Sequence, residues 1–291
     1  MNPTMVTASK TIAAALALSL VSATLALSNE ADQATDADIA AQRAALAAAT
    51  DGAGFGPQSP RDIDVLTGNN DRAKGLAPPH TALSLCNIHF HESAEHRGGD
   101  FTTYAGPGDG EGTGTGFVYD GTLSQTELAP LETPIGAGQH GDLTPGDTIE
   151  IHFVYSSAQV APGPTLGACL TEAIANPQLR VETVVAVLVN DPAARDFTQM
   201  AAIRTVDGRA QVSALPGDLG PPVVYAGSTT GPSYNRAASP FHVTWSVRPR
   251  ATKIDIASVG AWLADNPFDE TGAHGVRNLV VNPDLLAPIE N

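Results

Sequence analysis

The chain has 291 residues, 42% of them hydrophobic, and a formal net charge of −16 at pH 7 with a pI near 4.6. This size predicts one large domain, with two domains as the alternative. The acidic excess argues against nucleic acid or an anionic membrane as a partner, because both would be repelled.

The first 28 residues have the pattern of a secretory signal peptide. Lys10 supplies a positive charge before the Ala/Leu-rich run TIAAALALSLVSATLALS, which ends in small residues. Cleavage after Ala23, Ala26 or Ser28 fits this pattern, and a retained membrane anchor is the alternative. We therefore expect a periplasmic or secreted protein that has no membrane attachment once residues 1–28 are removed.

Residues 29–80 are predicted to form an N-terminal arm and an irregular wrap before a main domain at 81–291. The Ala-rich part, 29–50, predicts a short helix or a frayed arm. Gly-Pro, Ser-Pro and Pro-Pro steps make residues 51–81 turn-rich, so we expect this segment to run irregularly around a sheet.

The stretch CNIHFHESAEHRGGD, residues 86–100, contains the pair His89 and His91. Ile88 and Phe90 alternate with polar neighbours over 87–91, which predicts a strand with both imidazoles on one face. Such a pair can chelate a metal ion. A solvated strand that happens to carry two histidines is the alternative.

The stretch YAGPGDGEGTGTG, residues 104–116, is too rich in glycine for the interior of a helix or strand. It predicts a mobile surface loop. A phosphate-binding loop is disfavoured, because neither a Lys-Ser/Thr ending nor a helical period follows it.

A second alternating stretch, TIEIHFVYS at residues 148–156, predicts a strand with Glu150 and His152 on one face. This strand supplies a third inward imidazole. Zinc held by three histidines, with the fourth position left to water, is the catalytic pattern, because a structural site fills all four positions with protein.

Further along, the apolar run VETVVAVLV at 181–189 predicts a central strand buried on both faces. Residues 193–203 and 256–264 are predicted helices, and residues 243–247 and 279–281 are predicted strands. Without an alternating βαβ rhythm, this pattern favours a mainly β fold with a mostly antiparallel sheet and short peripheral helices.

The two cysteines, Cys86 and Cys169, predict one disulfide in an exported chain. A metal-ligand role for Cys86 is the alternative. On a regular strand, residue 86 faces away from His89 and His91, which disfavours that role.

Five motifs in this order resemble the landmarks of alpha-type carbonic anhydrases: His89-Phe90-His91, Glu95-His96, Glu150-Ile151-His152, Tyr225 to Pro232 and Val243-Thr244-Trp245. The run NIHFHESAEHRGGDF resembles the delta class more closely, a class first known from diatoms and also found in bacteria. The resemblance covers about residues 83–285. It implies an alpha-carbonic-anhydrase-like fold and reversible, zinc-dependent hydration of carbon dioxide to bicarbonate.

Two further features bear on this resemblance. The segment GPQSPRDID from Gly56 is similar to a Gln-Ser-Pro stretch near the start of alpha-type enzymes, where it helps to position the sheet. The 61-residue interval between His91 and His152 is longer than in alpha-type members, so a class-specific insertion is expected there.

The resemblance implies one Zn²⁺ per chain, bound by His89, His91 and His152. It makes Thr230 the residue that accepts the proton of the zinc-bound hydroxide and donates to Glu95. Thr229 takes this role if the alignment has a one-residue gap. Judged without the resemblance, Thr230 is a turn hydroxyl before Pro232.

Other implied roles concern the surroundings of the zinc ion. Glu150 and His96 would hold the ligand rings, although Glu150 could be a fourth ligand and His96 an ordinary core histidine. The implied pocket for carbon dioxide is lined by Val154, Val185 and Trp245, which as an alternative are plain core residues.

Proton transfer to bulk water needs a carrier, and imidazole suits this task because its pKa lies near neutrality. His80 and His140 are candidates in loops, but neither aligns with the shuttle position of the family, and exposed loop histidines are the alternative.

Two rival functions remain at this stage. A zinc hydroxide beside an apolar wall also attacks esters, which makes a zinc esterase the first alternative. The second is a non-catalytic carbonic-anhydrase-like binding module, which the complete set of three histidines disfavours. The sequence leaves an oligomer possible.

Overall fold

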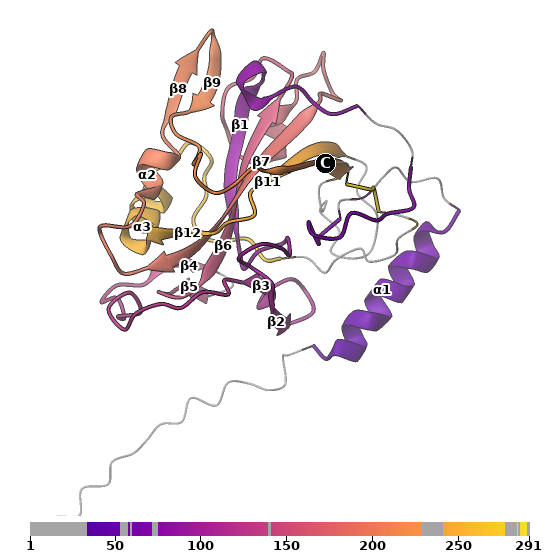
Figure 1. Cartoon of the computed structure of the whole chain (residues 1–291). Helices are drawn as coiled ribbons and strands as arrows, with labels where there is room; N and C mark the ends of the chain where they lie inside the picture. Colours follow the sequence, from indigo (N-terminus) through magenta and orange to yellow (C-terminus); the bar gives the residue numbers. More distant parts are fainter. Residues whose placement is uncertain are drawn as a thin grey trace, which may run out of the picture. The chain divides into compact units, whose positions relative to one another are not determined.

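The structure is a computed structural model, and it describes residues 34–52, 58, 60–71, 75–138, 141–228, 241–276, 284 and 286–289. Asp32–Asn291 form one compact unit, and most of its helices and strands are labelled in Figure 1. The predicted signal peptide at 1–28 and the predicted strand at 279–281 lie outside the described residues.

A six-stranded sheet lies at the centre of this unit. Five of its strands follow the order β1 (Ser84–Glu92), β6 (Thr148–Ser156), β7 (Leu179–Val189), β11 (His242–Val247) and β10 (Val223–Ser228), and β12 (Thr252–Asp255) pairs with β7. The pairs β1–β6, β6–β7 and β10–β11 are antiparallel, whereas β11 and β12 run parallel to β7. The predicted mainly β fold is confirmed. The central sheet contains both antiparallel and parallel strand pairs.

Strand β7 is the predicted central strand. It hydrogen-bonds to β6 along one edge and, on the other, first to β11 and then to β12. Of its residues, only Arg180 is not fully buried. Burial on both faces explains why its sequence is almost continuously apolar, without the alternation of a half-exposed strand.

The two faces of the sheet pack differently. On one face, Ile88, Phe90 and Phe153 pack against α2 (Phe197–Met200) and α3 (Ile256–Ala264). We call the opposite face, which carries His89, His91 and His152, the histidine face. Its apolar residues form a second cluster around Val154, Val185 and Trp245.

Phe90 tests the packing of the helices on the first face. Its ring contacts Phe197 and Trp262, with ring centroids 5.9 and 6.1 Å away. We expect Phe90→Ala to lower the free energy of unfolding by about 3–5 kcal/mol, because it leaves a cavity between sheet and helices. Urea unfolding of the metal-free protein measures this loss, and Ile174→Ala, at an exposed side chain, should change the value by less than about 0.5 kcal/mol.

Three small hairpins surround the sheet: β2 (Thr103–Pro107) with β3 (Thr115–Val118), β4 (Ile135–Gly138) with β5 (Gly141–Leu143), and β8 (Ile203–Val206) with β9 (Arg209–Val212). The prediction of a loop over 104–116 was wrong at both ends, since β2 and β3 pair there. Gly106, at φ +119°, lies where their register shifts, a backbone conformation that glycine permits without strain.

The helix predicted at 193–203 is much shorter than expected. It is reduced to α2, and Ile203 already begins β8. The other helices agree with the sequence. Residues 256–264 form α3, and the Ala-rich arm forms α1 (Asp36–Thr50), which begins at a capping box between Thr35 and Asp38. Two 3-10 turns, η2 (His80–Ala82) and η3 (Leu166–Cys169), complete the elements.

The predicted disulfide is present between Cys86 and Cys169. The prediction that Cys86 faces away from His89 and His91 was wrong, however. The register of β1 and β6 shifts between Leu85 and Asn87, so Cys86 is a bulged residue and packs in the same cluster as Val154 on the histidine face. A bulge adds one residue to a strand, so side chains before and after it no longer alternate regularly between the two faces of the sheet.

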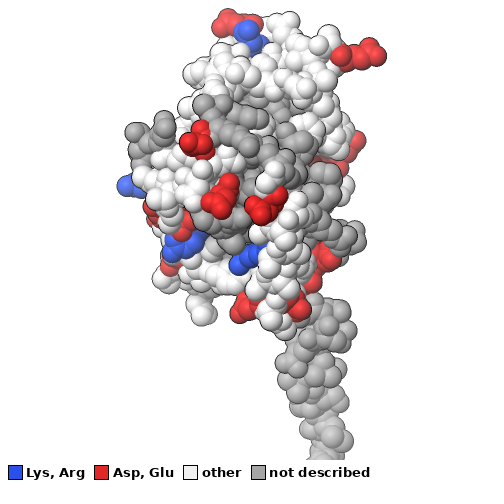
Figure 2. All heavy atoms as spheres, turned by 90° about the vertical axis from the view of Figure 1, so that its right-hand side faces the viewer, with Lys and Arg blue, Asp and Glu red and all other residues white. Residues whose placement is uncertain are grey.

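The surface agrees with the composition. On the face drawn in Figure 2, acidic and basic side chains are interspersed, and the described residues there form no continuous basic surface. Among the described residues, no helix combines the length and the apolar character needed to span a bilayer.

Candidate metal centre

Three imidazoles meet on the histidine face. The register of β1 and β6 places His89 opposite His152, and His91 opposite Glu150. The ring centroids of His89, His91 and His152 lie 4.9 to 5.3 Å apart, and one ring nitrogen from each lies within 4.8 Å of the others. The structure therefore brings together residues that are up to 63 positions apart in the chain.

The outer nitrogen of each ring has its own hydrogen-bond acceptor. His89 Nδ1 donates to Asn87 Oδ1 (2.6 Å), and His91 Nδ1 donates to the Gly275 carbonyl (3.0 Å). His152 Nε2 donates to Glu150 Oε1 (2.7 Å). A neutral imidazole carries one proton, so these bonds leave a lone pair on the inner nitrogen of every ring.

The inner nitrogens of the three rings could hold a metal ion between them. His152 Nδ1 and His89 Nε2 are 3.2 Å apart, and two lone pairs at this distance repel. Tetrahedral zinc with Zn–N bonds of 2.0–2.1 Å separates its nitrogen ligands by about 3.3 Å. The nitrogens of His89 and His152 therefore have the spacing of two zinc ligands, and all three nitrogens are of the type that zinc binds.

The protonation of the rings supports the same conclusion. Burial, together with the neighbouring His152 and His91, holds the pKa of His89 well below its usual value. Burial likewise lowers the pKa of His91 to about 4, although the Glu95 carboxylate opposes the shift. Both rings are therefore neutral at pH 7, the state in which imidazole binds metal ions.

The buried Glu150 carboxylate accepts three hydrogen bonds. Its Oε1 accepts from His152 Nε2 and His96 Nδ1, and its Oε2 accepts from the His96 backbone N–H (2.9 Å). Burial opposes its ionisation, but the charge of His96 and these hydrogen bonds keep its pKa well below the usual value. His96 Nε2 in turn lies 2.6 Å from the hydroxyl oxygen of Tyr225, so the His96 ring links Glu150 to β10.

A second set of ligand atoms, from Glu95, Glu150 and His152, also lies within 4.8 Å of one another. Glu150 Oε1 already accepts two hydrogen bonds, and one of these would have to break for this oxygen to bind a metal ion. The three-histidine set requires no such loss. The geometry thus favours Glu150 as the acceptor that orients His152.

Glu95 lies beside the histidines and is paired with Arg61. Arg61 Nη1 donates to Glu95 Oε2 at 3.0 Å, and Glu95 Oε1 is 3.7 Å from His91 Nδ1. Burial would raise the pKa of Glu95, but His91 and Arg61 outweigh it and lower the pKa to about 2. Within the described part of the chain, the buried Oε1 has no hydrogen-bond partner. Thr230 and Thr229, the residues predicted to donate to Glu95, lie outside the described residues.

The three residues predicted to line the pocket are all buried on the histidine face. Val154 follows His152 by two positions on β6, and Val185 is opposite Glu150 in the register. The Trp245 ring lies edge-on to His152, with centroids 5.1 Å apart, and its Nε1 donates to the Ser228 carbonyl. All three therefore border the cluster of imidazoles and carboxylates.

One of the two shuttle candidates, His80, is not brought to this cluster. His80 packs against Tyr155 and lies 3.4 Å from Glu182, and both of these side chains project from the face opposite the histidines. The sheet thus separates His80 from the three imidazoles. His140 lies outside the described residues.

Glu182 provides a test on that opposite face. Burial would raise its pKa, but hydrogen bonds from His80 and Arg180 and the charge of Arg248 lower it from 4.5 to about 2. A carboxylate with a lowered folded-state pKa stabilises the fold above about pH 4.5, and this contribution is lost as the pH falls towards 2. We expect Glu182→Gln to lower the free energy of unfolding by about 3–5 kcal/mol at pH 7. The free energy of unfolding of the variant should also fall less steeply than that of the unaltered protein as the pH is lowered from 4.5 to 2. Urea unfolding between pH 2 and 7 measures both effects. An unchanged loss of stability below pH 4.5 in the variant would contradict the lowered pKa of Glu182.

Four residues at the site were missed from the sequence. Asn87 could have been found, because it precedes His89 by two positions and therefore faces the same way. No sequence pattern pointed to a role for Arg61 or Gly275 at this site. The His274 ring lies 5.3 Å from that of His89, and His274 Nε2 is 2.7 Å from Glu270. It is part of no motif in the sequence.

The segment after Gly56 also contributes more than expected. The Pro60 carbonyl accepts a hydrogen bond from the Tyr225 hydroxyl at 3.0 Å, and the next residue is Arg61. The Arg97 N–H donates to the Arg61 carbonyl, and Arg97 forms an ion pair with Asp62. This short segment therefore supports Glu95 and the His96–Tyr225 contact from outside the sheet.

Comparisons with known proteins agree with these motifs. The sequence model of the delta carbonic anhydrase family matches residues 80–258, which is more than half of the chain. No curated protein matches the chain.

Solved structures match as well, among them two alpha-carbonic anhydrases. The enzyme from Photobacterium profundum is 17% identical, with 80% of this chain and 89% of that chain covered and a TM-score of 0.27. The enzyme from Thermovibrio ammonificans, in complex with the inhibitor sulfanilamide, is 14% identical, with 76% and 84% covered and a TM-score of 0.23. With scores this low, the assignment depends on the family match. The chain therefore belongs to the delta carbonic anhydrase family and is a carbonic anhydrase, a lyase that hydrates carbon dioxide.

Proposed function

We propose that this chain hydrates carbon dioxide reversibly through one zinc ion bound by His89 Nε2, His91 Nε2 and His152 Nδ1. The observation that carries the proposal is the convergence of three lone pairs, two of them 3.2 Å apart, from rings whose outer nitrogens are all hydrogen-bonded. When bound, zinc would supply a hydroxide at neutral pH, since in carbonic anhydrases it lowers the pKa of a bound water to about 7.

The protein itself would orient the nucleophile. We propose that Thr230 accepts the proton of that nucleophile and donates its own hydroxyl proton to Glu95 Oε1. Glu95 Oε1 has no hydrogen-bond partner among the described residues, which supports this role, and the Arg61 pair keeps the carboxylate ionised and fixed. A hydroxyl that must donate to a carboxylate can only accept on its other side, which sets the direction of the reacting lone pair.

Carbon dioxide is apolar and needs a dry wall beside the nucleophile. We propose Val154, Val185 and Trp245 for this wall, since all three are buried next to the imidazoles. Bicarbonate, being charged and polar, is held less well by such a wall, which favours product release.

Metal analysis together with a carbon dioxide hydration assay tests the proposal. The purified protein should contain one zinc per chain, lose hydration on removal of zinc by a chelator, and regain it when zinc is added back. Hydration by the zinc-free protein would contradict the proposal. Ester hydrolysis without hydration would favour the esterase, and bound zinc with neither activity would indicate a binding module.

We also propose that the protein is exported to the periplasm or secreted. The pattern around Lys10 supports this location, as does the Cys86–Cys169 disulfide, because disulfides persist in oxidising compartments. The mass of the mature protein should correspond to cleavage after Ala23, Ala26 or Ser28. An intact N-terminus on the protein from cells would contradict export by a cleaved signal peptide.

A further inference from the structure

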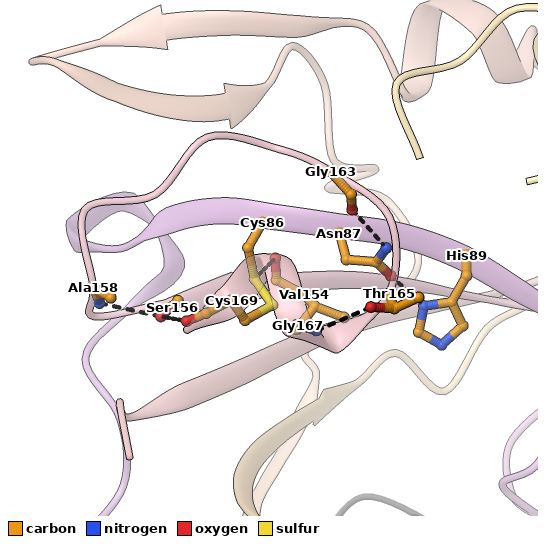
Figure 3. Close-up of a disulfide and its surroundings, with 10 residues drawn as sticks. All are labelled: Cys86, Asn87, His89, Val154, Ser156, Ala158, Gly163, Thr165, Gly167 and Cys169. Carbon is orange, nitrogen blue, oxygen red and sulfur yellow. Dashed lines mark hydrogen bonds between the residues drawn. A yellow bond between two sulfur atoms is a disulfide. The ribbon is translucent and has the colours of Figure 1, made fainter. Parts of the chain in front are cut away.

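Asn87 stands between the disulfide and the candidate metal centre. It is 1% exposed, and its amide makes a hydrogen bond at each end. Nδ2 donates to the Gly163 carbonyl at 3.1 Å, and Oδ1 accepts from His89 Nδ1 at 2.6 Å (Figure 3). The two ends of this amide therefore have different partners.

The Gly163 carbonyl determines which way the Asn87 amide faces. A carbonyl oxygen only accepts, so the NH₂ group of Asn87 must point at Gly163 and its oxygen at His89. His89 must then carry its proton on Nδ1, which leaves Nε2 free for a metal ion. A flipped amide would present NH₂ to Nδ1 and favour the tautomer with the proton on Nε2, where the metal would bind.

Gly163 lies in a segment that has little regular structure to hold it. Residues 157–178 connect β6 to β7 and contain only η3. The Gly163 N–H donates to the Cys86 carbonyl at 3.0 Å, which is available because the bulge takes Cys86 out of the β1–β6 ladder. A few residues later, Cys169 ends η3 and is bonded covalently to Cys86.

The disulfide thus links the two segments that contact the Asn87 side chain, β1 and the segment after β6. Cys86 is its neighbour in the chain, and Cys169 joins the segment carrying Gly163 to β1 (Figure 3). Besides this bond, the segment is held by hydrogen bonds, among them Ser156 Oγ to the Cys169 carbonyl and the Ala158 N–H to Ser156 Oγ. Without the covalent link, hydrogen bonds and the packing of Val160 and Leu166 against the apolar cluster would have to keep the carbonyl in place.

We propose that the Cys86–Cys169 disulfide is a positioning element of the metal centre, which holds Gly163 so that its carbonyl fixes the Asn87 amide and, through it, the tautomer of His89. The proposal rests on the three-histidine site proposed above. Asn87 and Gly163 are accordingly positioning residues that act through His89.

The test is the affinity for Zn²⁺, measured at pH 7 by competition with a chromophoric chelator. We expect the double variant Cys86→Ala/Cys169→Ala to bind zinc about 10- to 100-fold more weakly, the range found when a partner of a metal-bound histidine is lost. Asn87→Ala should give a similar loss. Because both changes act through one hydrogen bond, the triple variant should be no weaker than Asn87→Ala alone.

Asn87→Asp separates positioning from simple destabilisation. An aspartate oxygen accepts from His89 Nδ1 whichever way the carboxylate turns, so it fixes the tautomer without Gly163. In the Asn87→Asp background, removal of both cysteines should leave zinc affinity unchanged. Val259→Ala, a buried change in α3 on the opposite face, is the matched control and should lower stability without weakening zinc binding.

Several outcomes would overturn the inference. One is unchanged zinc affinity in the cysteine double variant, and another is additive losses in the triple variant. An equal loss from cysteine removal in the Asn87→Asp background would likewise show that the disulfide acts only on general stability. The proposed function fails separately, if the unaltered protein binds no zinc at all.

Discussion

His152→Ala should remove nearly all zinc from the purified protein and reduce carbon dioxide hydration to the uncatalysed background. The change takes away one of three convergent nitrogens and leaves His89 and His91 as a two-ligand site. It also removes a donor from the buried Glu150 carboxylate. Metal analysis by mass spectrometry and stopped-flow hydration measure the two losses on the same sample.

The control for this prediction is His80→Ala, the same substitution on the opposite face of the sheet. It should retain zinc and activity, although the loss of the contact with Glu182 lowers stability. Full activity of His152→Ala would remove His152 from the ligand set. A loss of activity in His80→Ala with zinc retained would restore His80 as a candidate for proton transfer.

Glu95→Gln should keep its zinc and lose most of its turnover, with kcat reduced about 10²- to 10³-fold, as when one preorganised hydrogen-bonding group is removed. The Arg61 guanidinium only donates, so the glutamine oxygen must face it and the NH₂ group must replace Oε1. If Thr230 has the role proposed above, its hydroxyl can no longer donate there, and the nucleophile loses its orientation. Steady-state kinetics with parallel metal analysis separates kcat from zinc content.

Glu127→Gln is the matched control for this substitution. Glu127 pairs with Lys253 in a partly buried ion pair that includes none of the site residues, so the kinetics and zinc content of the variant should be unchanged. If Glu95→Gln loses zinc in proportion to activity, Glu95 supports the metal centre and has no separate orienting role. Unchanged kcat would exclude Glu95 from the reaction.

The sequence alone was sufficient for the parts of the site that lie on regular strands. Alternation over 87–91 and 148–156 placed His89, His91 and His152 on common faces, because side chains on a strand alternate with a period of two. The burial of β7 followed from its continuous apolar run in the same way. These features depend on near neighbours in the chain, which a local pattern records.

Only the tertiary structure decided what depends on broken periodicity or on distant segments. The bulge at Cys86 reversed the face predicted for its side chain, and pairing between β2 and β3 overrode a glycine-rich composition. Arg61 reaches Glu95 from 34 positions away, and the Gly275 carbonyl reaches His91 from 184 positions away. Such contacts are set by how strands and loops pack against one another. Every residue has a backbone carbonyl, so the residue type does not indicate which carbonyl will accept a hydrogen bond. No local pattern could therefore have revealed these contacts.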